Sequence, residues 1–336
     1  MTIRVGINGF GRIGRNFVRA AKASGADFDF VAVNDLGSID TMAHLLQYDS
    51  VLGRFPEKVS ATKSTIKVGG DSLRVLSERN PADLPWGELG VDVVIESTGF
   101  FNSRDGAAAH LDGGAPLVIV SAPASNADAT FVYGVNHKDF RISKHKVISN
   151  ASCTTNCFVP MVKVLDDAFG VEQGLMTTIH SYTGDQNLVD GPHGDMRRAR
   201  AAAINIVPTS TGAARATSLV MESMKGKLDG TALRVPTPNG SLTDFTVNLK
   251  KAASVEQINA AFEAASKKAL KGVLKYTEDP IVLADIVTDP HSCVFDAGLT
   301  MSMGKLVKIN GWYDNEWGYS NRLVDLTLFT GSKVKR

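Results

Sequence analysis

The 336-residue sequence contains only three cysteines, Cys153, Cys157 and Cys293. So few, and an odd number, do not form a disulfide framework, and their spacing is not that of paired zinc ligands. The chain also lacks any apolar run approaching the roughly 18–20 residues that a membrane-spanning helix needs. It begins with a strand-like segment and shows no signal-peptide pattern. We therefore expect a cytoplasmic protein with no metal site and no membrane association.

An excess of charge of one sign is absent too. Lys and Arg together number 36, Asp and Glu 35, and the net charge is +1. Proteins that bind nucleic acid or membrane surfaces usually carry a basic excess or a basic stripe, so we expect neither partner. The 43% of hydrophobic and 21% of charged residues are typical of a globular protein. The length corresponds to about two domains.

Short apolar segments alternate with helix-like segments in the first half of the chain. The strand candidates, rich in Val and Ile, are residues 3–8, 30–34, 91–96, 117–120 and 146–149. Helices are predicted at residues 12–23 and 104–111, and a hairpin at residues 62–76. Strands that alternate with helices in this way predict a doubly wound parallel sheet.

The pattern changes after about residue 150. Alternation typical of strands with one buried face occurs at residues 175–182, 233–235, 244–249, 292–299 and 306–313. Ser254 and Gln257 form a capping-box signature, and apolar residues then recur at helical spacing as far as Ala269. The connection at residues 184–210 is unusually long, and loops of that length are commonly functional. This half predicts an α+β domain.

A glycine-rich turn joins the first predicted strand to the first predicted helix. It reads Gly-Phe-Gly-Arg-Ile-Gly at residues 9–14. Such glycines let backbone N–H groups approach a pyrophosphate, and the helix N-terminus adds a partial positive charge. Asp35 ends the next strand, where its carboxylate can accept both ribose hydroxyls and would repel a 2′-phosphate. The alternative is a simple turn followed by a surface aspartate, but it is less consistent with the strand–turn–helix setting. The turn and Asp35 together favour NAD as the cofactor.

Small polar residues join a strand to a helix near the middle of the chain. They read Asn-Ala-Ser-Cys-Thr-Thr-Asn-Cys at residues 150–157. Ser and Thr are natural N-caps, so Cys153 is predicted near a helix N-terminus, which would lower its thiol pKa. From the residues alone, a cysteine that only packs in the core is at least as good an interpretation. Nothing in the pattern selects one of the seven histidines as its partner.

Over essentially its whole length the sequence resembles the glyceraldehyde-3-phosphate dehydrogenase family. The resemblance rests on residues 150–157 and 6–14, and on Ser-Tyr-Thr at 181–183, Arg-Arg-Ala-Arg at 197–200, Thr-Gly-Ala-Ala at 211–214, Arg-Val-Pro-Thr-Pro at 234–238 and Trp-Tyr-Asp-Asn-Glu at 312–316. It implies an α/β fold with a Rossmann-type doubly wound parallel sheet domain for NAD at residues 1–150, completed by a C-terminal helix at 316–336. Residues 151–315 would form an α+β catalytic domain with a mixed or antiparallel sheet.

The resemblance also implies an activity and a set of site residues. Glyceraldehyde 3-phosphate, phosphate and NAD would give 1,3-bisphosphoglycerate and NADH, in glycolysis or gluconeogenesis. Cys153 would form a thioester, with His180 as its base. The implied substrate and phosphate ligands are Ser152, Thr154, Thr183, Arg198, Thr211, Gly212 and Arg234. The implied NAD contacts are Gly9, Gly11, Arg12, Ile13, Asp35, Arg79, Ser121 and Asn315. A homotetramer that meets through residues 184–210 is implied as well.

The residues themselves support part of this assignment. Residues 209–212 carry hydroxyl groups and precede a helix-like segment at 213–224, and a helix start is an anion site. Arg198 and Arg234 can offer bidentate forks to phosphate oxygens. Arg197 and Arg200 are better interpreted as surface or interface charges, and Cys157 and Cys293 as packing residues.

Three other functions fit parts of the pattern. Erythrose-4-phosphate dehydrogenase shares the implied fold, nucleophile and cofactor but would hydrolyse its acyl intermediate. A semialdehyde dehydrogenase with a cysteine nucleophile would lack this arginine and Thr-Gly pattern. A non-catalytic NAD-binding regulator would need neither Cys153 nor His180. A rate that depends strictly on inorganic phosphate would reject the erythrose-4-phosphate dehydrogenase alternative.

Overall fold

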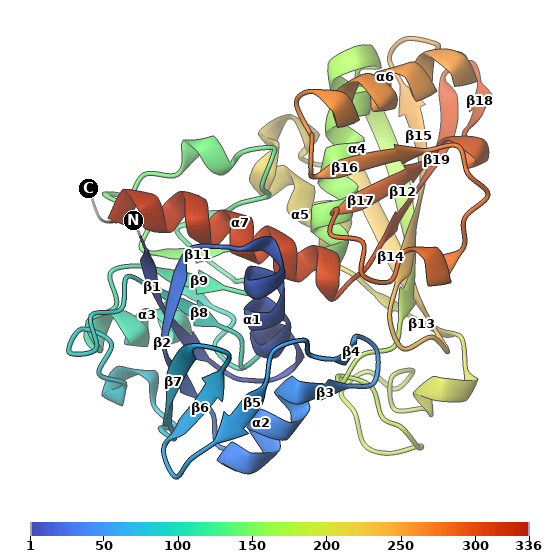
Figure 1. Cartoon of the computed structure of the whole chain (residues 1–336). Coiled ribbons are helices and arrows are strands. Elements are labelled where there is room, and N and C mark those ends of the chain that lie inside the picture. The colour runs from blue at the N-terminus through green and yellow to red at the C-terminus, as the bar shows by residue number, and fades with distance from the viewer. Residues whose placement is uncertain (1, 335–336) are drawn as a thin grey trace. The chain divides into compact units, whose positions relative to one another are not determined.

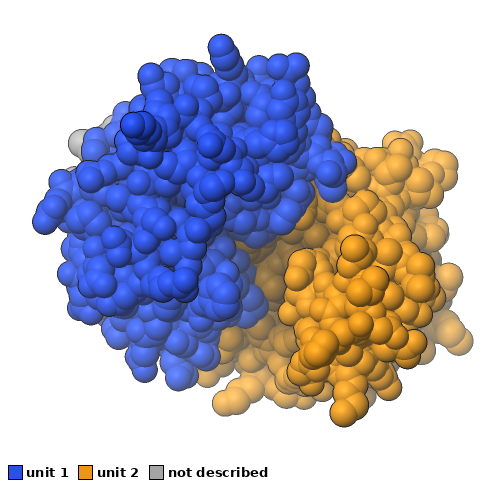
Figure 2. Space-filling view, turned by 90° about the horizontal axis from the view of Figure 1, so that it is seen from below, with its two compact units in different colours: residues 1–131, 137–151, 320–336 blue, residues 132–136, 152–319 orange. Residues whose placement is uncertain are grey.

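The computed structural model describes residues 2–334 and divides the chain into two units, coloured blue and orange in Figure 2. Unit 1 consists of the residues up to Phe131, residues 137–151 and the residues from Ser320 onward. Unit 2 consists of residues 132–136 and 152–319. Among residues 2–334, no helix is long and apolar enough to cross a membrane, and no group of three His, Cys, Asp or Glu side chains could hold a metal ion.

Unit 1 is built on a nine-stranded sheet with the order β10-β11-β9-β8-β1-β2-β7-β6-β5. The strands are β1 (Ile3–Asn8), β2 (Phe28–Asn34), β5 (Val59–Ala61), β6 (Thr65–Val68), β7 (Asp71–Leu76), β8 (Val93–Glu96), β9 (Val118–Val120), β10 (Ala129–Thr130) and β11 (Val147–Ser149). The helices are α1 (Arg12–Ser24), α2 (Ile39–Gln47), α3 (Arg104–Asp112) and, from Ser320 onward, α7 (Trp317–Val334). Strands β3 (Tyr48–Asp49) and β4 (Gly53–Arg54) form a separate ribbon.

The predicted parallel sheet is confirmed. The neighbouring strands from β10 through to β7 all pair in parallel. The remaining two pairings, β7 with β6 and β6 with β5, are antiparallel. The chain moves to opposite sides of β1, to β2 on one side and to β8 on the other (Figure 1). Parallel sheets bind ligands at the carboxyl ends of the strands beside such a reversal, so the ends of β1, β2 and β8 are where a cofactor is expected.

Some unit 1 elements differ from the sequence-based predictions. The hairpin at residues 62–76 is confirmed as β6 and β7 around Gly69 and Gly70, but it continues into an unpredicted third strand, β5. Helix α2 was not predicted. Its signal is local, because the Ser38 hydroxyl accepts from the Thr41 N–H and caps its start. The predicted helix at 316–336 begins at Trp317, and residues 335 and 336 lie outside the described residues.

Unit 2 is built on an eight-stranded mixed sheet, β13-β14-β12-β15-β19-β17-β16, with β18 paired to β19. The strands are β12 (Val171–Ser181), β13 (Val207–Ser210), β14 (Leu228–Val235), β15 (Ser241–Leu249), β16 (Leu274–Thr277), β17 (Cys293–Asp296), β18 (Met301–Met303) and β19 (Leu306–Tyr313). The helices are α4 (Cys153–Phe169), α5 (Ala213–Val220) and α6 (Val255–Lys267). The β12–β14 and β16–β17 pairs are parallel and the other pairs antiparallel.

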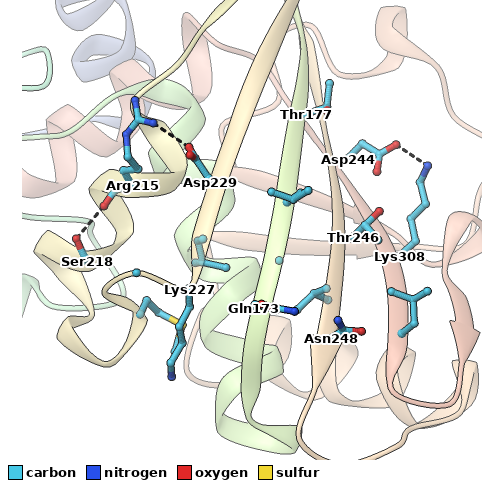
Figure 3. A pocket seen from close by; sticks show the side chains of 17 residues that line it. Gln173, Thr177, Arg215, Ser218, Lys227, Asp229, Asp244, Thr246, Asn248 and Lys308 are labelled. Carbon is cyan, nitrogen blue, oxygen red and sulfur yellow. Dashed lines mark hydrogen bonds and ion pairs between the residues drawn. The ribbon is translucent and has the colours of Figure 1, made fainter.

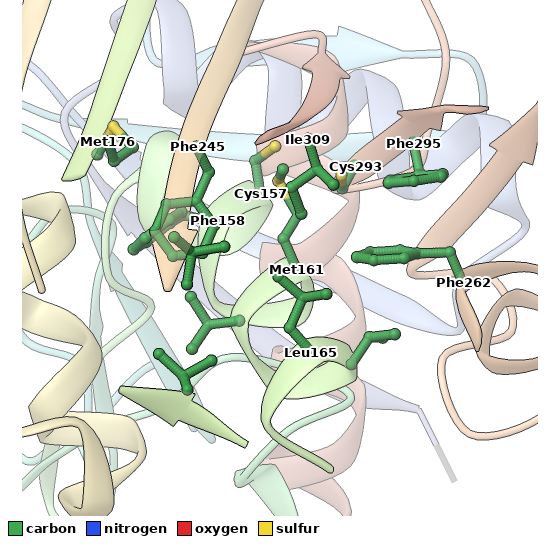
Figure 4. Close-up of a cluster of buried hydrophobic side chains, with 14 of the residues drawn as sticks. Cys157, Phe158, Met161, Leu165, Met176, Phe245, Phe262, Cys293, Phe295 and Ile309 are labelled. Atoms are coloured by element: carbon green, nitrogen blue, oxygen red, sulfur yellow. The ribbon is translucent and has the colours of Figure 1, made fainter. Parts of the chain in front are cut away.

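Apolar side chains of α4 and α6 pack against this sheet and form the core of unit 2 (Figure 4). Phe158 meets Phe245 edge to face, and Phe262 stacks on Phe295 with ring centroids 3.8 Å apart. Cys157 is fully buried in this cluster, as expected of a packing residue. The predicted capping box at Ser254 is also confirmed. This core anchors α4, the helix that begins at Cys153.

Several boundaries in unit 2 were predicted wrongly. The predicted strand at 292–299 ends at Asp296, because the Asp296 carboxylate accepts the Gly298 N–H and starts a short 3-10 turn. The helix predicted at 213–224 ends at Val220 and is followed by a separate 3-10 turn at Glu222–Met224. The helical spacing of apolar residues runs as far as Ala269, but helix α6 ends earlier, at Lys267.

Candidate active site

The turn before α4 fixes the position of Cys153. Ala151 has φ +56°, a left-handed conformation that residues other than glycine rarely adopt. Ser152 caps the helix through its hydroxyl, which accepts the Thr155 N–H at 3.0 Å. Cys153 is therefore the first residue of α4, as predicted from the small polar residues around it. Strained backbone of this kind is concentrated at functional sites.

Cys153 and His180 form a close pair. The Cys153 Sγ lies 3.5 Å from the His180 Nε2, near the end of strand β12. The His180 Nδ1 lies 2.7 Å from the Ser181 carbonyl oxygen, which can only accept a hydrogen bond. The proton of the neutral ring is therefore on Nδ1, and the Nε2 lone pair faces the thiol. This arrangement can remove a proton from the sulfur.

The helix start acts on the Cys153 pKa in the expected direction, since the Thr154 N–H lowers it, but the expected net lowering is not found. Burial raises the pKa of the Cys153 thiol, and this effect exceeds the opposing influence of the Arg234 charge and the Thr154 N–H. Burial, together with the positive charge of Arg234, lowers the pKa of His180 to about 3. The resting pair is therefore a thiol beside a neutral imidazole.

Arg234 stands next to this pair because of the strand register. In the parallel β12–β14 pairing His180 lies opposite Arg234. The Arg234 Nη1 donates to the Ser181 carbonyl oxygen and to the Thr183 hydroxyl, both at 3.2 Å. Its Nε is buried and has no hydrogen-bond partner among residues 2–334. A buried guanidinium N–H without a partner indicates a place for an anionic ligand.

The second candidate arginine is already engaged. The Arg198 Nη1 donates to the Asp185 carboxylate at 2.5 Å, and its Nε donates to the Thr209 hydroxyl at 3.0 Å. Thr211 and Gly212 directly precede α5, and the Thr211 hydroxyl accepts the Ala213 N–H at 3.2 Å. A phosphate at this position would have to replace Asp185 on the Arg198 fork.

The Thr154 hydroxyl faces the core, so only the Thr154 backbone is placed to contact a ligand. The Tyr313 hydroxyl lies 2.8 Å from the Thr154 hydroxyl and 2.8 Å from the Thr178 hydroxyl. Tyr313 is 1% exposed, and burial raises the pKa of its hydroxyl, which stays protonated and ties α4, β12 and β19 together. Sequence reasoning missed this residue, although it lies within the motif at 312–316.

The Tyr313→Phe variant is expected to lose about 1–3 kcal/mol of unfolding free energy, because two buried threonine hydroxyls lose a partner. Chemical denaturation followed by fluorescence measures this loss. The control is Tyr276→Phe, whose hydroxyl bonds Glu278 at an exposed position, and which should change stability by no more than about 0.5 kcal/mol. Equal losses in the two variants would contradict the proposed tie.

In unit 1 a cavity of about 430 Å³ lies at the carboxyl ends of the central strands. It is lined by Asn8, Gly9, Gly11, Asn34, Asp35, Leu36, Glu78, Arg79, Ser97, Thr98, Phe100 and Phe101. Gly9 has φ +92°, and a Cβ there would lie 2.6 Å from the Thr98 nitrogen. Only glycine fits this approach, which matches the predicted role of the turn in bringing backbone close to a pyrophosphate.

The cavity brings together Gly9, Gly11, Asp35 and Arg79 of the predicted cofactor residues. The Asp35 carboxylate accepts the Phe10 N–H at 2.7 Å and so joins the second strand to the glycine-rich turn. Arg12, Ile13 and Ser121 do not line the cavity, and Arg12 is instead paired with Asp49 at 2.5 Å. Sequence reasoning missed the other lining residues, such as Asn8 and Asn34, although each ends a strand of the parallel sheet.

Asn315 belongs to unit 2 and has a fixed orientation. Its Oδ1 accepts the Gly240 N–H at 2.8 Å and the hydroxyls of Ser181 and Ser241 at 3.0 and 3.2 Å. A backbone N–H is an obligate donor, so the carbonyl side of the amide faces Gly240. The Asn315 Nδ2 is left as the group that can donate to a ligand.

Both parts of the chain match models of one family. The glyceraldehyde 3-phosphate dehydrogenase NAD binding domain matches residues 3–104, and the C-terminal domain of the same family matches residues 152–315. Glyceraldehyde-3-phosphate dehydrogenase 2 of Streptomyces avermitilis is 60% identical over 335 residues, covering 99% of this chain and all of the relative. The proteins named glyceraldehyde-3-phosphate dehydrogenase from Streptomyces coelicolor and Mycobacterium avium are each 61% identical, over 336 and 340 residues, with 99% of this chain and all of each relative covered. With both of its domains matched and such identity along its length, the chain belongs to the glyceraldehyde-3-phosphate dehydrogenase family.

Proposed function

We propose that this chain oxidises glyceraldehyde 3-phosphate to 1,3-bisphosphoglycerate, with NAD and inorganic phosphate, through a thioester on Cys153. The observation that carries the proposal is the 3.5 Å pair between the Cys153 Sγ and the His180 Nε2, whose tautomer is set by the Ser181 carbonyl. A binding protein has no need of a thiol aimed at a basic nitrogen. The family assignment supplies the substrate and the cofactor.

The first step forms a bond between the Cys153 sulfur and the aldehyde carbon. The thiol proton passes to the His180 Nε2, which then gives it to the aldehyde oxygen, so that a hemithioacetal forms and the imidazole is neutral again. NAD supplies the hydride acceptor, which leaves an acyl group on sulfur. As the C–H bond breaks, the His180 Nε2 accepts the proton of the hemithioacetal hydroxyl. Phosphate then attacks the thioester carbon, and the Cys153 sulfur leaves as a thiolate, which takes back the proton held by the His180 Nε2.

Two groups of residues would hold the two phosphates. Arg234 with Thr183 forms one group, supported by the buried Nε of Arg234 that lacks a partner among residues 2–334. Arg198, Thr211 and Gly212 at the start of α5 form the other, with Ser152 and the Thr154 backbone at the start of α4. Arginine suits both groups because its planar fork matches phosphate oxygens.

NAD would bind with its adenosine half in the unit 1 cavity. Gly9 and Gly11 would face the pyrophosphate with Arg12 and Ile13, and Asp35 would accept the ribose hydroxyls. Arg79 would border the adenosine, Ser121 the nicotinamide side. The Asn315 Nδ2 would donate to the carboxamide oxygen of the nicotinamide.

A cytoplasmic homotetramer is part of the proposal. The segment 184–210 exposes Leu188, Val189, Met196, Ile204 and Ile206, each at least 66% exposed. A groove of about 980 Å³ also runs over β14, β12, β15 and β19 of unit 2 (Figure 3). Exposed apolar side chains gathered on one segment favour burial against another subunit. All three cysteines are free thiols, which suits a reducing compartment.

One assay tests this function against the alternatives. NADH formation from glyceraldehyde 3-phosphate is followed at 340 nm with and without inorganic phosphate or arsenate. Strict dependence on the anion supports the phosphorylating reaction. A rate that continues without an anion would favour erythrose-4-phosphate dehydrogenase or another hydrolysing enzyme, and NAD binding without turnover would favour the regulator.

The Arg234→Gln variant is expected to raise the KM for glyceraldehyde 3-phosphate by about 10- to 100-fold, because one charged hydrogen-bond donor to phosphate is lost. Initial rates at saturating NAD and phosphate measure this effect. Lys267→Gln removes an exposed charge on α6 that is paired with Glu263, and serves as the control. An unchanged KM in Arg234→Gln would remove this residue from the substrate site.

A further inference from the structure

Strands β2, β1 and β8 are neighbours in the sheet of unit 1 (Figure 1). A line of buried polar side chains lies at their carboxyl ends. Asn34, Asn8 and Glu96 end these strands, and the register places Asn8 opposite both of the others. His110 of α3 and Trp86 continue the line, and none of the five residues is more than 4% exposed. Asn8 and Asn34 also line the cavity that the proposed function assigns to the adenosine half of NAD.

The direction of each hydrogen bond follows from one end of the line. The Glu78 N–H is an obligate donor and donates to the Asn34 Oδ1 at 2.7 Å. The Asn34 Nδ2 therefore donates to the Asn8 Oδ1 at 2.7 Å. The Asn8 Nδ2 in turn donates to the Glu96 Oε2 at 2.6 Å.

From the other end of the line, too, the hydrogen bonds lead to the Glu96 Oε2 as an acceptor. The Trp86 indole can only donate, and its Nε1 lies 3.0 Å from the His110 Nδ1. The His110 Nδ1 therefore accepts, and the proton of this ring is on Nε2. The His110 Nε2 lies 2.9 Å from the Glu96 Oε2 and donates to it.

The remaining oxygen of Glu96 connects the line to the cofactor cavity. The Glu96 Oε1 accepts the Thr98 N–H at 2.8 Å and the Thr98 hydroxyl at 2.5 Å. Both oxygens are thus acceptors, with four donors in all, so Glu96 is a carboxylate. The Thr98 nitrogen that it holds is the atom that a Cβ on Gly9 would meet at 2.6 Å. The Ser97 hydroxyl donates to the Gly9 carbonyl oxygen at 2.7 Å.

We propose that Trp86, His110 and Glu96 form a positioning relay for dinucleotide binding. The indole fixes the His110 tautomer, the imidazole fixes the Glu96 carboxylate, and the carboxylate holds Asn8 and Thr98 around the glycine-rich turn. None of the three residues touches the reacting atoms. The relay rests on the proposed function in one respect, namely that this cavity takes the adenosine half of NAD. Its benefit is preorganisation, since a turn already held in its binding geometry loses less entropy when the ligand arrives.

Two substitutions of His110 separate the relay from simple packing. Gln places its amide donor where the imidazole Nε2 stands, whereas Asn reaches only to the Nδ1 position. We expect His110→Asn to raise the Kd of both NAD and ADP-ribose about tenfold, because Glu96 loses a charge-assisted donor. His110→Gln should restore Kd to within about threefold of the native value. Isothermal titration calorimetry of the full chain measures both ligands. At saturating NAD, kcat should stay within about twofold of native in each variant, so the loss appears in KM alone.

Equal Kd values in the two variants, whatever their melting temperatures, would overturn the relay. Neutron diffraction from the native protein gives a second test that needs no variant. A deuteron on the His110 Nε2 supports the relay, and one on Nδ1 overturns it. The ADP-ribose titration also separates this inference from the proposed function. If the native chain forms no NADH in the presence of phosphate, the proposed function is wrong. The ADP-ribose affinities of the native protein, His110→Gln and His110→Asn would still decide whether the relay exists.

Discussion

Replacing Cys153 with serine is expected to reduce turnover by more than about a thousandfold. A serine hydroxyl ionises far less readily than a thiol, even though burial raises the pKa of the Cys153 thiol. The imidazole beside it can take a proton from sulfur but would face a much weaker acid in the variant. The ester that serine would form is also less reactive toward phosphate than a thioester. Initial rates of NADH formation and mass spectrometry of the acyl-enzyme measure both losses.

The matched control is Cys157→Ala, one helical turn further along α4. Cys157 is fully buried, and its Sγ lies 3.6 Å from the Gly311 carbonyl oxygen within the core of unit 2. This variant should keep its turnover and lose stability, because a cavity replaces a packed sulfur. Iodoacetate should label Cys153 in the native chain and abolish activity. Labelling of another position with loss of turnover, or an active Cys153→Ser variant, would refute the thioester.

The predictable part of the fold is the part that local sequence determines. The parallel strands of unit 1 could be located because their two buried faces require uninterrupted Val and Ile. The hairpin around Gly69 and the capping box at Ser254 carry chemistry that few other local structures share. Helix α2 carries only its Ser38 cap as a local signal, and the three residues of β5 are too few to show an alternating pattern.

The candidate site divides in the same way. The start of α4 at Cys153 was visible in the sequence because Ser152 is a strong N-cap. His180 was not, because a strand histidine becomes a base only through the Ser181 carbonyl and the register that brings Arg234 beside it. Burial is a property of the whole fold, so the sequence alone could not indicate that the Cys153 pKa is raised. The same holds for the tie between Thr154 and Tyr313.

Replacing His180 with asparagine is expected to lower kcat by about 10²- to 10⁴-fold, the usual contribution of a positioned base. The variant should also respond differently to pH. Without the base only the ionised fraction of Cys153 reacts, and burial raises the pKa of this thiol above its ordinary value. Below that pKa the thiolate fraction falls about tenfold for each pH unit, so the variant rate should rise about tenfold per unit between pH 7 and 9.

The native enzyme should reach its plateau at a lower pH than the variant. The pKa of His180 is lowered to about 3, so its Nε2 is unprotonated throughout the neutral range and can accept the thiol proton during attack. Rates of NADH formation and of iodoacetate alkylation from pH 6 to 10 measure both profiles, because alkylation reports the thiolate without hydride transfer. His193→Asn is the control, since this ring is outside the pair and its Nε2 lies 3.7 Å from the Asp185 carboxylate. If the pH profiles of the native enzyme and His180→Asn coincide, the Cys153 sulfur ionises without help from the imidazole. The role of His180 would then be limited to placing the Ser181 carbonyl and Arg234.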